Sequence, residues 1–180
     1  MSSAEKYRPY YTYQDYLGWE GRWELIDGLP YAMSPSPNTR HQLIVSRAHF
    51  IFNLAIKSNK CRKCKVIDFT DWKITDDIVL QPDIILTCLL KHGNFIDTPP
   101  DLIVEVLSPS TAMKDRREKF EIYQKQGVKY YIIIDPAFNK IEVFQVNNGI
   151  YEVISVNPSA FTFNVSDCTL NVDFADLFEE

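Results

Sequence analysis

The chain has 180 residues, of which 46% are hydrophobic and 24% are charged, and its formal net charge is −5. This length suits one domain with a full hydrophobic core, and this composition excludes an intrinsically disordered chain. The acidic total gives no general attraction for nucleic acid, whose binding rests on Lys and Arg. A local basic patch, such as KSNKCRKCK at residues 57–65, can still outweigh that total, because exposed charges are screened beyond about 10 Å.

The N-terminus lacks a basic stretch followed by an apolar segment, and the longest apolar runs, such as IILTCLL, are too short to span a bilayer. We therefore expect one domain over residues 1–180. We expect it in the cytoplasm, with no membrane partner.

The four cysteines are Cys61, Cys64, Cys88 and Cys168. Without a secretory signal, we expect reduced thiols rather than a disulfide framework. Cys61 and Cys64 form a C-x-x-C pair, but a structural zinc site normally needs four ligands in two such clusters, and no second pair follows. The favoured interpretation is a turn before a strand, with a zinc module as the alternative.

In chain order, the first elements are a short helix and a β-hairpin. Thr12 followed by Asp15 is typical of a helix start, which predicts a helix in YQDYLGW. RWELIDGLPYAM predicts the hairpin, because its Asp27-Gly28 pair suits a tight primed turn. Glu24 then lies on the first strand of that hairpin.

A long helix follows the Pro-rich break at residues 34–37. Thr39 and Gln42 form a capping box, and apolar residues recur at helical spacing from Leu43 to Ala55. This pattern places His41 in the first turn of the helix.

The second half of the chain alternates strands with one helix. KVIDFTDWKI, IVL, DIILTCLL and LIVEVL predict adjacent strands, and the last two are apolar enough to be central. TAMKDRREKFEIYQKQ predicts a helix over residues 111–126, capped by Ser110 or Thr111 and ended by Gly127. KYYIIIDP predicts another strand, and KIEVFQV with IYEVISV predicts a hairpin around residues 147–149, before the acidic tail FADLFEE. The order predicts an α/β (or α+β) domain: a mixed sheet flanked by helices, with added N-terminal and C-terminal β-hairpins.

Two carboxylates stand where apolar strands are expected. Asp83 follows Pro82 at the start of one strand, and Glu105 lies inside the next. Because burying an unpaired charge is costly, such groups are usually paired, neutralised or bound to metal. Carboxylates that converge from neighbouring strands suit Mg²⁺ or Mn²⁺. The alternatives are an ion pair of Glu105 with Arg or Lys, and a turn-and-cap role for Asp83.

The order Pro82, Asp83, Glu105 resembles the P-D…(D/E)-x-K signature of restriction-endonuclease-like nucleases. In that signature, two carboxylates hold Mg²⁺ and a lysine assists the attacking water. The lysine is missing here, because Leu107 stands two residues after Glu105. Taken alone, this departure favours an inactive protein.

Longer segments resemble the Uma-type family of restriction endonucleases. They are ELIDGLPYAMSPSPNTRHQLI, QPDIIL, LIVEVLSPSTAMKDRREKFEIYQKQGVKYYIIIDP and KIEVFQV, roughly residues 20–150. The resemblance implies a restriction-endonuclease-like core whose lysine has moved from the strand to the following helix. Lys119 is the candidate, and it shares one helical face with Asp115 and Tyr123. The alternative for Lys119 is a solvated lysine paired with Asp115.

The resemblance also implies a role for each site residue. The catalytic residues would be Asp83, Glu105 and Lys119; the metal ligands would be Asp83, Glu105 and the Val106 carbonyl; the accessory residues would be Glu24, His41, Asp115 and Tyr123. Glu24 would supply a further carboxylate or hold water. His41 would contact phosphate or transfer a proton, and a capping or core histidine is the alternative.

The implied function is Mg²⁺- or Mn²⁺-dependent hydrolysis of DNA phosphodiester bonds by an endonuclease. A homodimer is expected, because enzymes that cut both strands often pair two sites. The competing interpretation is an inactive module with the same fold that binds DNA or a partner protein, which Leu107 and the acidic charge favour.

Overall fold

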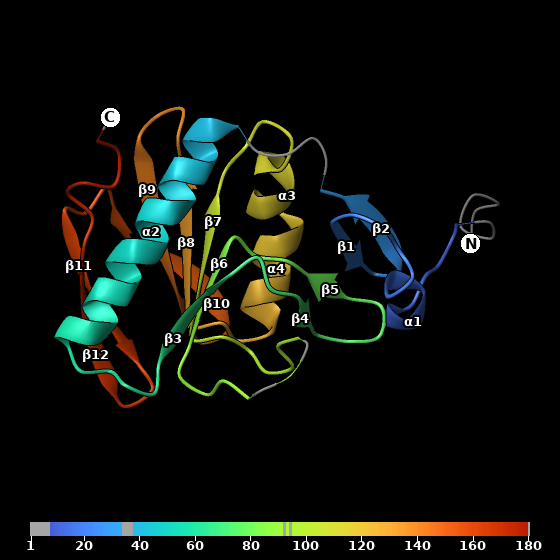
Figure 1. Ribbon diagram of the computed structural model, residues 1–180, viewed down its shortest axis with the longest axis horizontal. Coiled ribbons are helices and arrows are strands. Elements are labelled where there is room, and N and C mark those ends of the chain that lie inside the picture. Colours follow the sequence, from blue (N-terminus) through green and yellow to red (C-terminus); the bar gives the residue numbers. More distant parts are fainter. Residues whose placement is uncertain (1–7, 34–37, 92, 94, 180) are drawn as a thin grey trace.

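The structure is a computed structural model that describes residues 8–33, 38–91, 93 and 95–179 (Figure 1). The Pro-rich break at residues 34–37 lies outside the described residues. A six-stranded sheet with the order β10-β9-β8-β7-β6-β3 forms the centre of the molecule. Its strands are β3 (Lys65–Asp68), β6 (Ile84–Thr87), β7 (Leu102–Val106), β8 (Tyr130–Asp135), β9 (Lys140–Asn147) and β10 (Ile150–Val156). β7 and β8 are parallel, whereas the other pairs are antiparallel, which confirms the predicted mixed sheet.

A smaller sheet with the order β2-β1-β5-β4 lies on the right of Figure 1, beside the central layers. It contains β1 (Trp23–Ile26), β2 (Leu29–Ala32), β4 (Trp72–Lys73) and β5 (Val79–Leu80), and α1 (Tyr13–Tyr16) precedes it. The hairpin prediction is confirmed: Asp27 and Gly28 have φ of 50° and 71°, as a primed turn requires. The capping box of Thr12 and Asp15 is also present.

The helix α2 (Thr39–Ser58) covers one face of the central sheet (Figure 1). Its buried side includes Ile44, Ala48 and Phe52. The N-cap is Asn38, whose Oδ1 accepts a 2.9 Å hydrogen bond from the His41 backbone N–H, so the predicted cap at Thr39 is one residue late. No helix among the described residues is long and apolar enough to cross a membrane.

A hairpin that the sequence interpretation missed extends the layer formed by α2. It consists of β11 (Ala160–Val165) and β12 (Cys168–Asp173), and β12 packs along α2. Phe163, Val165, Leu170 and Val172 are buried and alternate with polar residues, which is the pattern of a half-buried strand. The hairpin therefore completes the core on the α2 side.

The helices α3 (Ala112–Arg116) and α4 (Glu118–Lys125) cover the opposite face of the central sheet (Figure 1). The predicted continuous helix over residues 111–126 is therefore wrong in one respect. It breaks at Arg117, where φ is −125° and ψ is −83°. Tyr123 and Tyr131 pack edge to face beneath α4, with ring centroids 5.1 Å apart.

Strand β7 explains why a carboxylate fits inside an apolar run. Val104 and Val106 belong to the hydrophobic cluster under α2, whereas Ile103 and Leu107 belong to the cluster under α4. Since side chains alternate along a strand, Glu105 points to the α4 side. It is therefore buried against the helix that carries Lys119.

The cysteines differ from the expectation of reduced thiols. Disulfides join Cys61 to Cys168 and Cys64 to Cys88. The C-x-x-C residues are thus bonded to partners on other segments. Sulfur atoms in a disulfide are not thiolates and do not bind zinc. The disulfide-bonded structure therefore does not support the alternative of a zinc module on Cys61 and Cys64.

Candidate active site

Glu105 is the centre of a buried polar cluster, with 2% of its surface exposed. The Lys119 Nζ donates a 2.7 Å hydrogen bond to the Glu105 Oε1. The Tyr123 hydroxyl donates a second bond of 2.7 Å to the same oxygen. The structure therefore brings together one residue from β7 and two from α4, as the helical spacing of Lys119 and Tyr123 predicts.

Asp83 lies beside Glu105 at the start of β6. The Val106 backbone N–H donates a 2.9 Å hydrogen bond to the Asp83 Oδ2. The Asp83 backbone N–H donates a longer bond of 3.3 Å to the Glu105 Oε2. In an extended strand, the N–H and the carbonyl of one residue point the same way. The Val106 carbonyl is therefore directed to the same edge as Asp83, and the three predicted metal ligands share one location.

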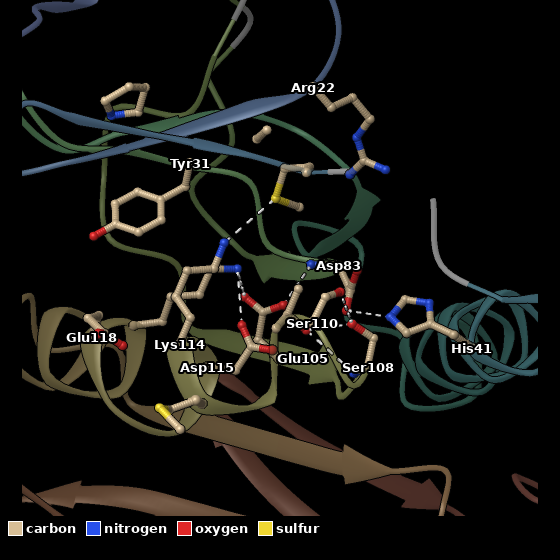
Figure 2. Close-up of a pocket in the computed structure, with 16 residues that line it drawn as sticks. Arg22, Tyr31, His41, Asp83, Glu105, Ser108, Ser110, Lys114, Asp115 and Glu118 are labelled. Atoms are coloured by element: carbon tan, nitrogen blue, oxygen red, sulfur yellow. Dashed lines mark hydrogen bonds and ion pairs between the residues drawn. The ribbon is translucent and has the colours of Figure 1, made fainter. Parts of the chain in front are cut away.

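His41 joins this location from the first turn of α2. Its Nε2 lies 3.4 Å from the Asp83 Oδ2, and the residue is 3% exposed (Figure 2). In the described part of the chain, its Nδ1 is buried without a hydrogen-bond partner. The alternative of a capping histidine is wrong, because Asn38 caps the helix by accepting from the His41 N–H and the His41 side chain faces Asp83.

Glu24 reaches the cluster from the smaller sheet and has no exposed surface. Its Oε1 lies 2.8 Å from the Lys119 Nζ and accepts a 3.0 Å bond from the Gln81 N–H. Its Oε2 forms an ion pair with Lys114, a residue that the sequence interpretation missed. The signal for Lys114 is weak, because it stands in the strongly charged run KDRREK.

Asp115 completes the cluster from α3 and is 1% exposed. Its Oδ1 lies 3.5 Å from the Lys119 Nζ, which is too long for a hydrogen bond, and that oxygen has no other partner within the described residues. Buried polar atoms are normally satisfied, so such an atom points to an unseen water or ion. The Asp115 backbone carbonyl accepts a 2.9 Å bond from the Tyr131 hydroxyl.

The cluster carries more negative than positive charge. Burial raises the pKa of Glu105 well above its ordinary value even though Lys119 opposes this, and burial also raises the pKa of Asp115. For Glu24, burial raises the pKa, but Lys119 and Lys114 outweigh it and the net shift is downward. Burial lowers the pKa of Lys119, yet the surrounding carboxylates raise it well above its ordinary value. A divalent cation would offset this excess of carboxylates.

A cavity of about 460 Å³ opens onto the cluster (Figure 2). Asp83, Glu105 and Lys119 form part of its wall, so the three predicted catalytic residues border one cavity. Arg22 and Lys114 also line it, together with the hydroxyl groups of Ser108 and Ser110. Cations and hydroxyl groups are the usual donors to phosphate oxygens.

The donor set fits Mg²⁺ or Mn²⁺. With the four cysteines in disulfides, no group of three or more His, Cys, Asp and Glu side chains among the described residues is arranged to hold a metal ion. A Mg²⁺ ion in a phosphate-handling site needs fewer protein ligands, because one or two carboxylates, waters and substrate phosphates suffice. Asp83, Glu105 and the Val106 carbonyl meet that requirement, and the unpartnered Asp115 oxygen lies nearby.

The α/β fold is shared with a solved structure. A crystal structure from Anabaena variabilis, described as "a putative nuclease belonging to DUF820", matches with a TM-score of 0.73. The match covers 93% of this chain and 97% of that chain at 20% sequence identity. At this identity the likeness establishes the shared fold alone.

Sequence comparison identifies the family. Residues 10–175 match the Uma2 family, described as "Putative restriction endonuclease". The chain therefore belongs to the Uma2 family, which confirms the family resemblance drawn from the sequence. A protein of Synechocystis sp., named "Uncharacterized protein slr1290", is 32% identical over 153 residues, which are 75% of this chain and 74% of the relative.

Proposed function

We propose that the chain is a Mg²⁺- or Mn²⁺-dependent endonuclease that hydrolyses phosphodiester bonds of DNA. One observation carries this proposal. The Lys119 ammonium lies 2.7 Å from Glu105, so a lysine from α4 stands beside the strand carboxylate where the nuclease signature has a lysine on the strand. The family assignment supports the nuclease activity, and the metal and the DNA substrate are the further steps of the proposal.

Asp83, Glu105 and the Val106 carbonyl would hold the ion. When bound, the ion supplies Lewis-acid polarisation of the phosphate and lowers the pKa of an attacking water. Tyr123 and Lys119 fix the Glu105 carboxylate through their bonds to its Oε1. His41 holds Asp83 in place from the other side.

Beside Glu105, the Lys119 ammonium would donate to the attacking water and stabilise negative charge on the phosphate. The water oxygen would bond to phosphorus and release one proton to solvent, while the bond from phosphorus to the leaving sugar oxygen breaks and that oxygen takes up one proton from solvent. Arg22 and Lys114 line the cavity and would contact neighbouring phosphates. The same wall carries the carboxylates of Asp83, Glu105, Asp115 and Glu118. A bound divalent cation would therefore have to offset this negative charge before a phosphate binds.

The test measures DNA cleavage by the full chain with Mg²⁺, with Mn²⁺ and with chelator. We expect Asp83→Asn and Glu105→Gln to abolish metal-dependent cleavage, while Glu152→Gln, an exposed carboxylate on β10, leaves it unchanged. Circular dichroism and thermal melting check that each variant is folded. Cleavage by both site variants at the wild-type rate would overturn the proposal. DNA binding with no cleavage by the wild type would instead favour the inactive module.

A further inference from the structure

The four cysteines of the chain line a single cavity. This cavity has a volume of about 330 Å³, and among the described residues none lines both it and the candidate active site. His41 begins α2 at the active site, whereas Cys61 follows the end of that helix, whose 20 residues span about 30 Å. The cysteine cavity is therefore remote from the nuclease site.

The backbone assembles the cysteines from three separate segments. The Cys64 N–H donates a 3.0 Å hydrogen bond to the Cys61 carbonyl, which closes a tight turn after α2. Cys64 and Cys88 continue the register of the paired strands β3 and β6, and their Cα atoms are 3.7 Å apart. Cys168, at the start of β12, has its Cα 5.8 Å from that of Cys61. Four sulfur atoms thus converge on one corner of the fold.

The surroundings of this corner favour thiolates. Three of the four cysteines are buried and the fourth is half-buried. Lys60, Arg62 and Lys63 line the same cavity. Nearby cations lower the pKa of a thiol, and they would offset the net negative charge of a metal tetrathiolate. The basic stretch at residues 57–65 would therefore stabilise negatively charged sulfur atoms at this corner.

We propose that the four cysteines are the ligands of a structural Zn²⁺ ion in the reduced protein, and that the two disulfides are the oxidised, metal-free form of the same site. Each disulfide takes two electrons and two protons from a dithiol reductant, which itself becomes a disulfide. The four thiols then release their protons to solvent as Zn²⁺ binds.

The donor set specifies the metal and the role. Soft thiolate ligands select zinc over Mg²⁺ or Mn²⁺, and four of them close the tetrahedral coordination shell. A closed shell leaves no position for water or substrate, so this ion stabilises the fold and takes no part in chemistry. It would fasten the end of α2 to the ends of β6 and β12.

The first experiment uses the wild-type full chain. The protein is reduced with a phosphine, incubated with Zn²⁺, desalted and analysed for metal and free thiols. We expect about one zinc ion per chain. Peroxide should then release that zinc to a chromogenic chelator while the four thiols disappear. Reduced protein that retains less than about a tenth of an equivalent of zinc, or that binds iron instead, would overturn the proposal.

The second experiment compares matched variants. Cys168→Ser should bind zinc at least about tenfold more weakly than the wild type and lose the visible spectrum of a tetrathiolate site when Co²⁺ replaces Zn²⁺. Asp167→Asn, which removes an exposed carboxylate at the rim of the same cavity, should bind zinc as the wild type does. Equal zinc binding by Cys168→Ser and the wild type would contradict the assignment. The wild-type measurement decides the matter if Cys168→Ser fails to fold.

Discussion

The Nζ of Lys119 lies 2.7 Å from the Oε1 of Glu105, although the two residues are on different elements, the central strand β7 and the helix α4. This contact places an ammonium group beside Glu105. The nuclease signature has a lysine two residues after this carboxylate, but here that residue is Leu107. Because Lys119 and position 107 are different residues, the effect of each on DNA cleavage can be measured separately.

Replacing Lys119 by Met should reduce DNA cleavage by about 10²-fold or more, because a charged donor at the reacting phosphate is lost. Lys125→Met on the exposed side of α4 is the matched control and should keep full activity. Single-turnover rates at saturating metal measure the difference. If Lys119→Met cleaves as fast as Lys125→Met, the ammonium plays no part in the reaction.

A lysine returned to the strand should restore part of the activity that Lys119→Met loses. Side chains at positions 105 and 107 lie on the same face of the chain, so Leu107→Lys directs its ammonium toward the Glu105 side. The double variant Lys119→Met with Leu107→Lys is compared with Lys119→Met alone. No gain in cleavage, with both variants folded, would show that the two lysine positions are not equivalent.

Tyr123→Phe removes one donor to Glu105. We expect a loss of about 1 kcal/mol in the free energy of unfolding, together with slower cleavage, because Glu105 is less well oriented. Tyr151→Phe is a close control, since its hydroxyl is also buried but donates to the Val128 carbonyl. Urea unfolding should show a similar loss for both variants. Slower cleavage by the Tyr151 variant as well would mean that stability alone accounts for the effect.

His41→Ala should raise the Mg²⁺ concentration needed for half-maximal cleavage by about tenfold, because Asp83 loses the group that orients it. The same helix offers a control, since His49 pairs with Asp68 outside the active-site cavity. We expect His49→Ala to leave the metal dependence unchanged. Titrations of Mg²⁺ at fixed DNA concentration measure the Mg²⁺ concentration for half-maximal cleavage. An equal increase in both variants would mean that the effect comes from the helix as a whole and not from the contact with Asp83.

Glu24 should make the fold sensitive to acid. Its folded pKa lies below its unfolded value because Lys119 and Lys114 outweigh burial. Its contribution to stability is therefore complete above the unfolded pKa, about 4.3, and is lost as the pH falls through the folded pKa. Glu24→Gln should cost about 3 kcal/mol at neutral pH, and the difference from the wild type should shrink below about pH 4.

Thermal or urea unfolding between neutral and acidic pH measures this effect of Glu24→Gln. Glu121→Gln, on the exposed side of α4, is the control and should be neutral at every pH. A stability difference between Glu24→Gln and the wild type that stays constant with pH would contradict the assigned pKa shift.

Local patterns predicted the elements and much of the site. Asp27-Gly28 specifies its turn by backbone preference, and the i, i+4 spacing of Lys119 and Tyr123 lies wholly within α4, after the break at Arg117. Glu105 was visible because a carboxylate inside an apolar strand has few stable arrangements. These features depend on neighbours close in the sequence, so the sequence alone contains them.

The features that the sequence did not reveal depend on distant segments. Cys61 meets Cys168 across 107 residues, and no spacing rule connects them. Lys114 on α3 meets Glu24 on β1 across 90 residues of sequence, and the charged neighbours of Lys114 conceal this role. The hairpin β11–β12 has regular alternation, but the surface that buries its apolar side is α2, a helix more than 100 residues earlier in the chain.

The parallel pairing of β7 and β8 has a consequence for recognising such proteins. Parallel neighbours require a crossover connection, and α3 and α4 form that crossover directly after Glu105. The crossover must return over the face of the strand it has just left, so a lysine 14 residues downstream reaches the same carboxylate as one on the strand. This topology therefore allows a lysine on the strand and a lysine on the crossover helix to place the ammonium group at the same point beside the carboxylate. If the proposed function holds, a motif search that demands a lysine two residues after the acid would miss proteins with this arrangement.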